Sequence, residues 1–260
     1  MTRPAAMLLV LLAAGCLRSD FNLATQREEY TMTSTDKEVE LGRKIARRVE
    51  HEMALTADQP LQERVQAIGD RLAAICDRRE LVYHFRVIAD EDVNAFSLPG
   101  GYVFVNDGLI KKTAGDDELA AVIAHEVAHI SARHSVKRYE TGLGLQLAQL
   151  ATMAARSARM ARGVGVAARA AQLAYARQDE LEADALGVKY MKEAGFDPKA
   201  MLAFLETLHG LHAAKPRYIA RGVVRPHYAL THPYVPERVL AVKEALYGVA
   251  DYIDYLNAPQ

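Results

Sequence analysis

The chain has 260 residues, of which 50% are hydrophobic and 25% are charged, so it is long enough for one large domain or two small ones. Its 32 Lys and Arg residues are balanced by 33 Asp and Glu residues. Because no net positive charge would attract a phosphate backbone, the composition argues against nucleic acid as a partner.

The first residues have the pattern of a secretory signal. Arg3 precedes an apolar run from Ala5 to Ala14, and Cys16 follows. This run is too short to cross a bilayer as a mature helix, which favours a signal peptide over residues 1–15. It also resembles a bacterial lipobox, in which the cysteine is acylated and becomes the first mature residue. Ala13 stands where a lipobox usually has a large aliphatic residue, so plain secretion is the alternative.

Residues 16–35 are polar and lack periodicity, so we expect a lipidated N-terminus with a flexible tether. A single folded domain over 36–255 is predicted to follow. It opens with two amphipathic helices, the second of which starts at Pro60. The segment "LVYHFRVIAD" then alternates between apolar and polar residues, which predicts a strand.

The segment "NAFSLPGGYVFVNDGLI", residues 94–110, predicts two short strands joined by a tight turn at Pro99 and its two following glycines. On one interpretation this is simply a packed hairpin. On the other, the second strand leaves an edge to which an extended peptide adds its backbone hydrogen bonds. The residues expected to bind substrate on this second interpretation are Asn94, Gly101, Tyr102, Val103 and Phe104.

A largely buried helix is predicted over residues 116–139, and it contains the motif H-E-x-x-H. A helix turns about 100° per residue, so His125 and His129 project within roughly 40° of each other and can bind one metal ion. Glu126 points to one side of this pair, where it can take a proton from a metal-bound water. Burying these three side chains without partners would cost several kcal/mol, which favours a metal over a metal-free cluster.

His134 is expected to lie outside this site. If the helix continues, His134 lies about 140° round it from His129, so we interpret it as a polar surface residue. The metzincin arrangement is excluded as well, since Ala132 and Ser135 stand where it requires Gly and His. The third ligand must therefore come from another segment.

The candidate segment for the third ligand is "ARQDELEADALGVKYMKEAG", residues 176–195, which has helical periodicity. Glu180 and Asp184 are four residues apart on one face of this helix and are flanked by apolar positions. This spacing suits one metal ligand and one acceptor that holds a ligand histidine by its other ring nitrogen. The alternative is an ordinary solvated acidic face.

Four motifs, "NAFSLPGGYVFVNDGLI", "HEVAHISARH", "ELEADALG" and "THPYVPERV", resemble in sequence and order those of the gluzincin metallopeptidases, the family of CAAX prenyl proteases and of HtpX-like and BepA-like bacterial proteases. The likeness covers about residues 36–250. It implies a mostly helical α+β zincin-type domain with a small antiparallel sheet. It also implies one zinc ion per chain held by His125, His129 and Glu180, with Glu126 as general base and Asp184 behind the ligands.

The same resemblance implies that His232 and Arg238 reach the active site. His232 would either stabilise the oxyanion or occupy the open zinc position and silence the enzyme. The alternative is that His232 is an ordinary loop histidine and Arg238 an ordinary surface arginine, neither of which reaches the active site. The resemblance implies no role for His227, the other histidine of this segment.

The membrane-embedded members of this family have several transmembrane helices, whereas the longest uncharged stretch here, residues 141–155, is shorter than the roughly 20 residues that a span needs. The chain therefore resembles the soluble periplasmic members. The Ala-rich segment 143–174 is compatible with a buried helix, a membrane-surface helix or a mobile lid. We favour a helical flap over the site, because Gly163 and Gly165 mark a break.

We therefore expect a zinc-dependent endopeptidase that hydrolyses unfolded or misassembled envelope proteins. It would lie in the bacterial periplasm, tethered to the outer membrane by lipidated Cys16, or else be soluble in the periplasm or secreted. The expected partners are extended polypeptides, the membrane, and outer-membrane assembly or quality-control proteins. The alternative is a zinc-containing periplasmic chaperone or scaffold with little or no proteolytic activity, in which His232 is a permanent fourth ligand.

Overall fold

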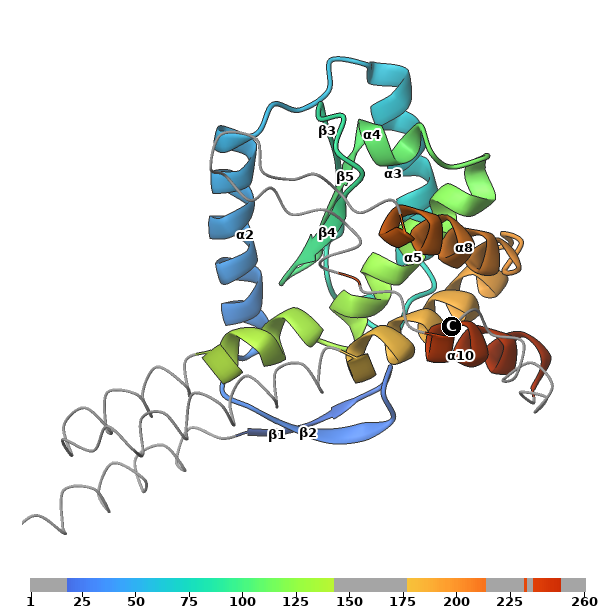
Figure 1. Cartoon of the computed structure of the whole chain (residues 1–260). Helices are drawn as coiled ribbons and strands as arrows, with labels where there is room; N and C mark the ends of the chain where they lie inside the picture. Colours follow the sequence, from blue (N-terminus) through green and yellow to red (C-terminus); the bar gives the residue numbers. More distant parts are fainter. Residues whose placement is uncertain (1–17, 143–176, 214–231, 233–235, 249–260) are drawn as a thin grey trace, which may run out of the picture.

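A computed structural model of the chain describes residues 18–142, 177–213, 232 and 236–248. Within these ranges the fold is α+β and mostly helical, with helices packed around a small sheet (Figure 1). None of the helices in these ranges has both the length and the apolar character that crossing a membrane requires. The predicted signal peptide, Cys16, the segment 143–174 and His227 lie outside the described residues.

The sheet has three strands, β3 (His84–Ile88), β4 (Ala95–Leu98) and β5 (Tyr102–Asn106), in the order β3-β5-β4. The predicted hairpin is confirmed, because β4 and β5 pair antiparallel around a turn in which Gly100 and Gly101 have positive φ. However, β5 also pairs in parallel with β3, so the sheet is mixed rather than antiparallel. The prediction that 101–105 forms a free edge is therefore wrong: β5 is the central strand, and β4 lies at the edge.

Two long helices precede the sheet, as predicted. In α2 (Thr35–Glu52) the hydroxyl of Ser34 accepts a hydrogen bond from the amide of Lys37, and in α3 (Gln59–Ala73) Asp58 caps the first turn in the same way. Pro60 lies in the first turn of α3, where its missing N–H costs nothing.

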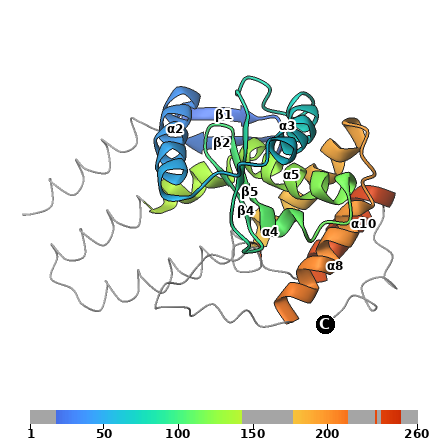
Figure 2. The same cartoon turned by 90° about the horizontal axis from the view of Figure 1, so that it is seen from above.

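The two faces of the sheet pack against different helices (Figure 2). Alternate side chains of β5 point to opposite faces, so Phe104 joins the small cluster beneath α2 while Val103 and Val105 join the main core. That main core also contains side chains of α3 and of the central helix α5 (Asp116–Ser131). From Leu119 to Ser131 every residue of α5 is buried.

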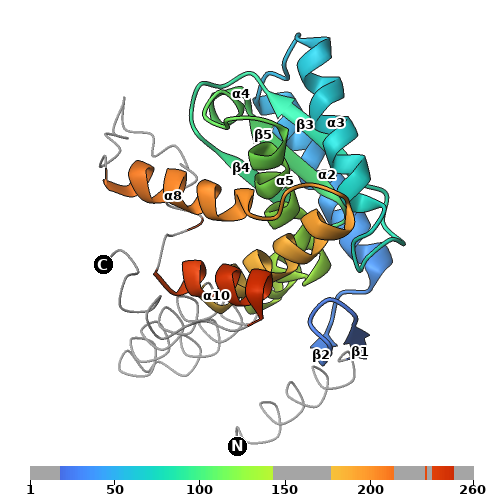
Figure 3. The same ribbon diagram turned by 90° about the vertical axis from the view of Figure 1, so that its right-hand side faces the viewer.

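After α5 the chain turns instead of continuing as one helix to residue 139. Arg133 adopts a left-handed conformation with φ 57, and a new helix runs over 134–142. The later helices are one over 177–193, α8 (Ala200–Ala213) and α10 (Pro236–Tyr247), with the short α4 (Asp107–Ile110) preceding α5. Figure 3 shows α5, the helix over 177–193 and α10 lying together.

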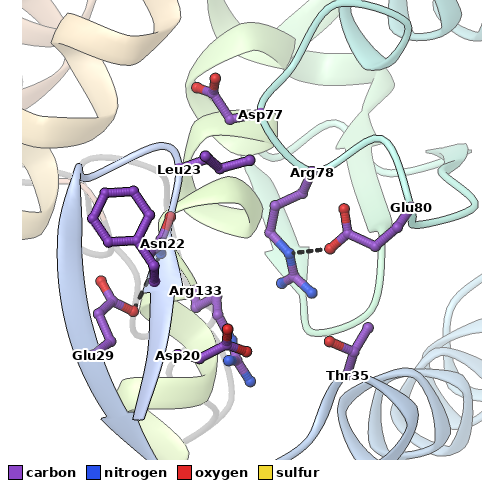
Figure 4. A pocket seen from close by; sticks show the side chains of 10 residues that line it. Asp20, Asn22, Leu23, Glu29, Thr35, Asp77, Arg78, Glu80 and Arg133 are labelled. Atoms are coloured by element: carbon purple, nitrogen blue, oxygen red, sulfur yellow. Dashed lines mark hydrogen bonds and ion pairs between the residues drawn. The ribbon is translucent and has the colours of Figure 1, made fainter.

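The expected flexible tether is wrong for residues 18–31, which form an antiparallel hairpin of β1 (Arg18–Asn22) and β2 (Arg27–Thr31). The hairpin is held to the helix over 134–142, because Lys137 lies 2.8 Å from the Glu29 carboxylate and the Thr31 hydroxyl donates to Glu140 at 2.7 Å. A pocket of about 220 Å³ lies between this hairpin and residues 77–80 (Figure 4). It contains none of the histidines of the H-E-x-x-H motif.

Candidate metal centre

Four buried side chains meet where α5, the helix over 177–193 and residue 232 come together. His125, His129, Glu180 and His232 each offer one ligand atom, and these atoms all lie within 4.8 Å of one another. The Nε2 atoms of His125 and His129 are 3.0 Å apart, and the Glu180 carboxylate lies 3.2 Å from the first and 3.4 Å from the second. Two imidazole nitrogens and a carboxylate are a donor set typical of zinc, so the residues present fit this ion.

The local sequence explains why these side chains converge. The two histidines are four residues apart on α5 and so share one face, as their spacing predicts. Small and apolar residues of the helix over 177–193, among them Ala183 and Met191, belong to the same core as α5. The two helices therefore pack directly together, and Glu180 is carried to the histidine pair.

Behind this cluster lies a second buried group of charges. Asp184 is completely buried, and its Oδ1 lies 3.0 Å from Nδ1 of His125. Arg238 donates to both Asp184 oxygens, at 2.6 Å and 2.8 Å, and lies 3.2 Å from Glu180. Asp184 thus lies against the ring nitrogen of His125 that faces away from the cluster. Arg238 does reach the site, where its contacts with the two carboxylates suit charge neutralisation.

His232 lies inside the cluster rather than at its margin. It is 4% exposed, and its Nδ1 lies 3.1 Å from Glu180 and 3.3 Å from His125. Its Nε2 faces Oε1 of Glu126 at 3.4 Å. This position suits a fourth metal ligand, which is one of the two roles expected for this histidine.

Glu126 is completely buried beside the cluster. Neither of its carboxylate oxygens accepts a hydrogen bond from any residue that the structure describes. A buried carboxylate without hydrogen bonds is costly, because its hydration has been lost without replacement. A metal ion with a bound water would supply the missing interactions, which is a second reason why the residues present fit a metal.

Glu180 and His129 have the protonation states that metal ligands need. Burial alone would raise the pKa of Glu180, but His232, His125 and His129 together hold it well below its ordinary value. Burial lowers the pKa of His129 well below its usual range, which leaves a neutral imidazole. Burial also acts to lower the pKa of His125, but Asp184 and Glu180 outweigh it and raise that pKa to about 9. A metal bound here would therefore displace a proton from His125.

The prediction that His134 is a polar surface residue is wrong. His134 is completely buried, and its Nδ1 lies 2.7 Å from Nδ1 of His129, while its Nε2 lies 3.1 Å from Glu182. The cause is the turn at Arg133, which ends α5 at Ser131 and folds the next residue back toward the cluster. No glycine or proline stands in this turn, so the usual signal of a helix end is missing from the sequence.

The residues expected to bind substrate are mostly core residues. Val103 and Phe104 are completely buried and Gly101 is buried, so they do not offer a binding surface. Asn94 is 3% exposed, and the half-buried ring of Tyr102 stacks on His84. The edge strand that packs against α5 is instead β4, whose residues are buried or half-buried.

Comparisons with known proteins agree with this geometry. The sequence model described as "Peptidase family M48" matches residues 59–246. The beta-barrel assembly-enhancing proteases of Yersinia pestis and Escherichia coli (strain K12) are both 32% identical to the chain, over 79% and 80% of its length. The mitochondrial metalloendopeptidase OMA1 of Schizosaccharomyces pombe is 29% identical over 85% of the chain. The chain spans 43% of the length of the two bacterial relatives and 65% of the yeast one.

Proposed function

Because the chain belongs to peptidase family M48 and has the HExxH-plus-glutamate geometry of a metallopeptidase, we propose that it is a zinc-dependent endopeptidase acting on unfolded or misassembled envelope proteins. The observation that carries this proposal is the buried Glu126, which has no hydrogen-bond partner among the described residues and lies beside four potential ligands. We assign one zinc ion per chain to His125, His129 and Glu180.

The proposed mechanism uses Glu126 as the proton carrier. When bound, zinc supplies Lewis acidity, which lowers the pKa of a bound water toward about 7 and polarises a carbonyl group. Glu126 takes the proton from the attacking water and later gives it to the leaving amine. Asp184 and Arg238 hold the ligands in place, since both are completely buried and contact the cluster directly.

The substrate is proposed to lie extended along β4. This strand is at the edge of the sheet and packs against α5, so a peptide paired with it would run past the cluster. Pairing of this kind needs free backbone N–H and C=O groups on the peptide. Unfolded segments meet this requirement, whereas compact proteins do not.

The test compares wild type with Glu126→Gln. We expect wild type to degrade casein and the variant to lose this activity by at least a hundredfold, because the amide cannot accept the proton. Zinc content, measured by elemental analysis, should stay at about one ion per chain in both, since Glu126 is not a ligand. A variant that still degrades casein would contradict the role of Glu126.

The position of His232 favours a second candidate function. With four ligands the zinc site would be closed, as in structural zinc sites, and the protein would act as a periplasmic chaperone or scaffold. This candidate predicts that wild type prevents aggregation of an unfolded protein without cleaving it. If His232 occupies the zinc position that a water would take, His232→Ala should give the protein casein-cleaving activity. If it does not, the variant should remain inactive.

We further propose that the chain is exported to the periplasm and anchored to the outer membrane by acylated Cys16. The two bacterial relatives are named for β-barrel assembly, so an outer-membrane assembly or quality-control partner is part of this proposal. Since β1 begins at Arg18, two residues after Cys16, such an anchor would hold the domain close to the lipid surface. The intact mass of the mature protein tests acylation, and plain secretion predicts an unmodified mass.

A further inference from the structure

His134 forms a buried chain of side-chain contacts behind His129. Its Nδ1 lies 2.7 Å from Nδ1 of His129, the ring nitrogen that faces away from the cluster. On its other side, its Nε2 lies 3.1 Å from the carboxylate of Glu182 and 3.5 Å from that of Asp179. His134 itself is completely buried, so water does not compete for these contacts.

The turn that brings His134 to this position is fixed by Arg133. A left-handed conformation is unfavourable for a residue with a Cβ atom, so surrounding contacts must maintain it. The Arg133 guanidinium donates to the carbonyl of Thr33 at 2.6 Å and lies 3.3 Å from the buried carboxylate of Glu38. The place of His134 is therefore determined by the fold around it and not by α5 alone.

The contacts determine which nitrogen carries each proton. An ionised carboxylate can only accept hydrogen bonds, so Nε2 of His134 must donate to Glu182. In the neutral form of its ring, His134 then has a lone pair on Nδ1, which accepts a hydrogen bond from the Nδ1–H of His129. His129 is thereby left with a lone pair on Nε2, the atom that faces His125 and Glu180.

We infer that His134 and Glu182 are positioning residues for the metal site, holding His129 in the one tautomer that can bind an ion through Nε2. The inference rests on the zinc site of the proposed function and adds two residues to it. Asp184 gives His125 the same support directly, at 3.0 Å. No carboxylate of the described residues contacts Nδ1 of His129, which receives its support from Glu182 through the ring of His134.

The test measures zinc affinity by competition with a chelator of known affinity. We expect His134→Leu to weaken zinc binding by about 10- to 100-fold, because His129 loses its acceptor. His134→Asn should recover much of this loss, since its Oδ1 can take the place of Nδ1. Glu182→Gln should weaken binding to a smaller extent, and because Gln has nearly the same shape and 15% of the Glu182 side chain is exposed, this variant should fold even if His134→Leu does not.

The matched control is Val136→Ala, a buried position on the same helix whose side chain has no polar atom with which to hydrogen-bond a histidine. It should lower thermal stability without changing zinc affinity. The positioning role would be overturned if both His134→Leu and Glu182→Gln bound zinc with wild-type affinity, or if Val136→Ala lost as much zinc affinity as they do. Either result would leave the proposed function standing. A wild-type protein that binds no zinc would overturn the proposed function and the inference with it.

Discussion

Arg238 is completely buried, and it is the residue through which the acidic side chains of the site are neutralised. Burying a guanidinium is costly unless its hydrogen bonds and its charge are both satisfied. Asp184 takes two of its hydrogen bonds, and Glu180 lies 3.2 Å from it. Burial would raise the pKa of Asp184, but Arg238 and His125 hold it below its ordinary value, so this carboxylate stays ionised.

Replacing Arg238 with methionine should therefore destabilise the protein strongly. The apolar chain fills much of the volume but leaves the buried Asp184 carboxylate without its guanidinium partner, and we expect a loss of about 3 to 5 kcal/mol in the free energy of unfolding. Urea denaturation of the metal-free protein measures this. Arg177→Met is the control, since its ion pair with Glu237 is 4.0 Å long and largely exposed, and it should change stability by less than about 1 kcal/mol. Equal effects of the two substitutions would contradict this account.

The sequence predicted some of these residues better than others. Fixed spacing on a helix places side chains on one face, and this rule predicts the pairs His125 with His129 and Glu180 with Asp184. His134 was not predictable in this way, because its position depends on a turn in which Arg133, rather than glycine, is left-handed. Family resemblance placed His232 and Arg238 near the site, while the contacts that define their roles involve residues about 50 positions away.

The β4–β5 turn lies close against α2. A Cβ atom added to Gly42 of α2 would overlap the carbonyl oxygen of Pro99 in this turn. The amide of Gly100 also donates to the buried carboxylate of Glu38 on the same helix, at 3.2 Å. Gly42 is therefore required for close packing, although glycine is a poor residue for the interior of a helix.

Gly42→Ala should lower stability despite the better helix propensity of alanine. The methyl group must displace the Pro99 carbonyl and with it the turn of the sheet, and we expect a loss of about 1 to 3 kcal/mol. Gly210→Ala in α8 is the matched control, because among the described residues no atom outside its chain neighbours and its own helix backbone lies within 4 Å of the added Cβ, and it should raise stability by up to about 1 kcal/mol. Thermal unfolding of both variants gives the sign of each change, and a stabilising Gly42→Ala would refute the close packing.

The two places where elements differ from expectation have physical causes. The strands β4 and β5 are adjacent in the sequence, and proline and glycine mark the turn between them. The parallel pairing of β3 with β5 joins strands that are not adjacent, and the local sequence pattern does not predict it. The sequence does not predict the hairpin at 18–31, because no glycine stands in its turn at residues 23–26. Gln26 takes the left-handed conformation there, with φ 54. Its strands also lack the alternation that a half-buried sheet would show.

Across the whole molecule, the metal centre joins segments that are far apart in the sequence. His125 and His129 come from α5, Glu180 from the helix over 177–193, and His232 from just before α10. Figure 3 shows α5, the helix over 177–193 and α10 lying together. An ion bound here would act as a cross-link between them, because the ligands are close together only in the folded chain.

Removing zinc should therefore lower the melting temperature. A ligand at 100 times its dissociation constant stabilises the folded state by about 2.7 kcal/mol, which corresponds to roughly 5 to 10 °C for a domain of this size. Scanning calorimetry with and without a chelator measures the shift. Glu126→Gln should keep the full shift, because Glu126 is not a ligand, whereas Glu180→Gln should lose most of it. If chelation leaves the melting temperature of wild type unchanged, the ion does not hold these segments together, and the cluster must be stabilised by its own hydrogen bonds and by Arg238 instead.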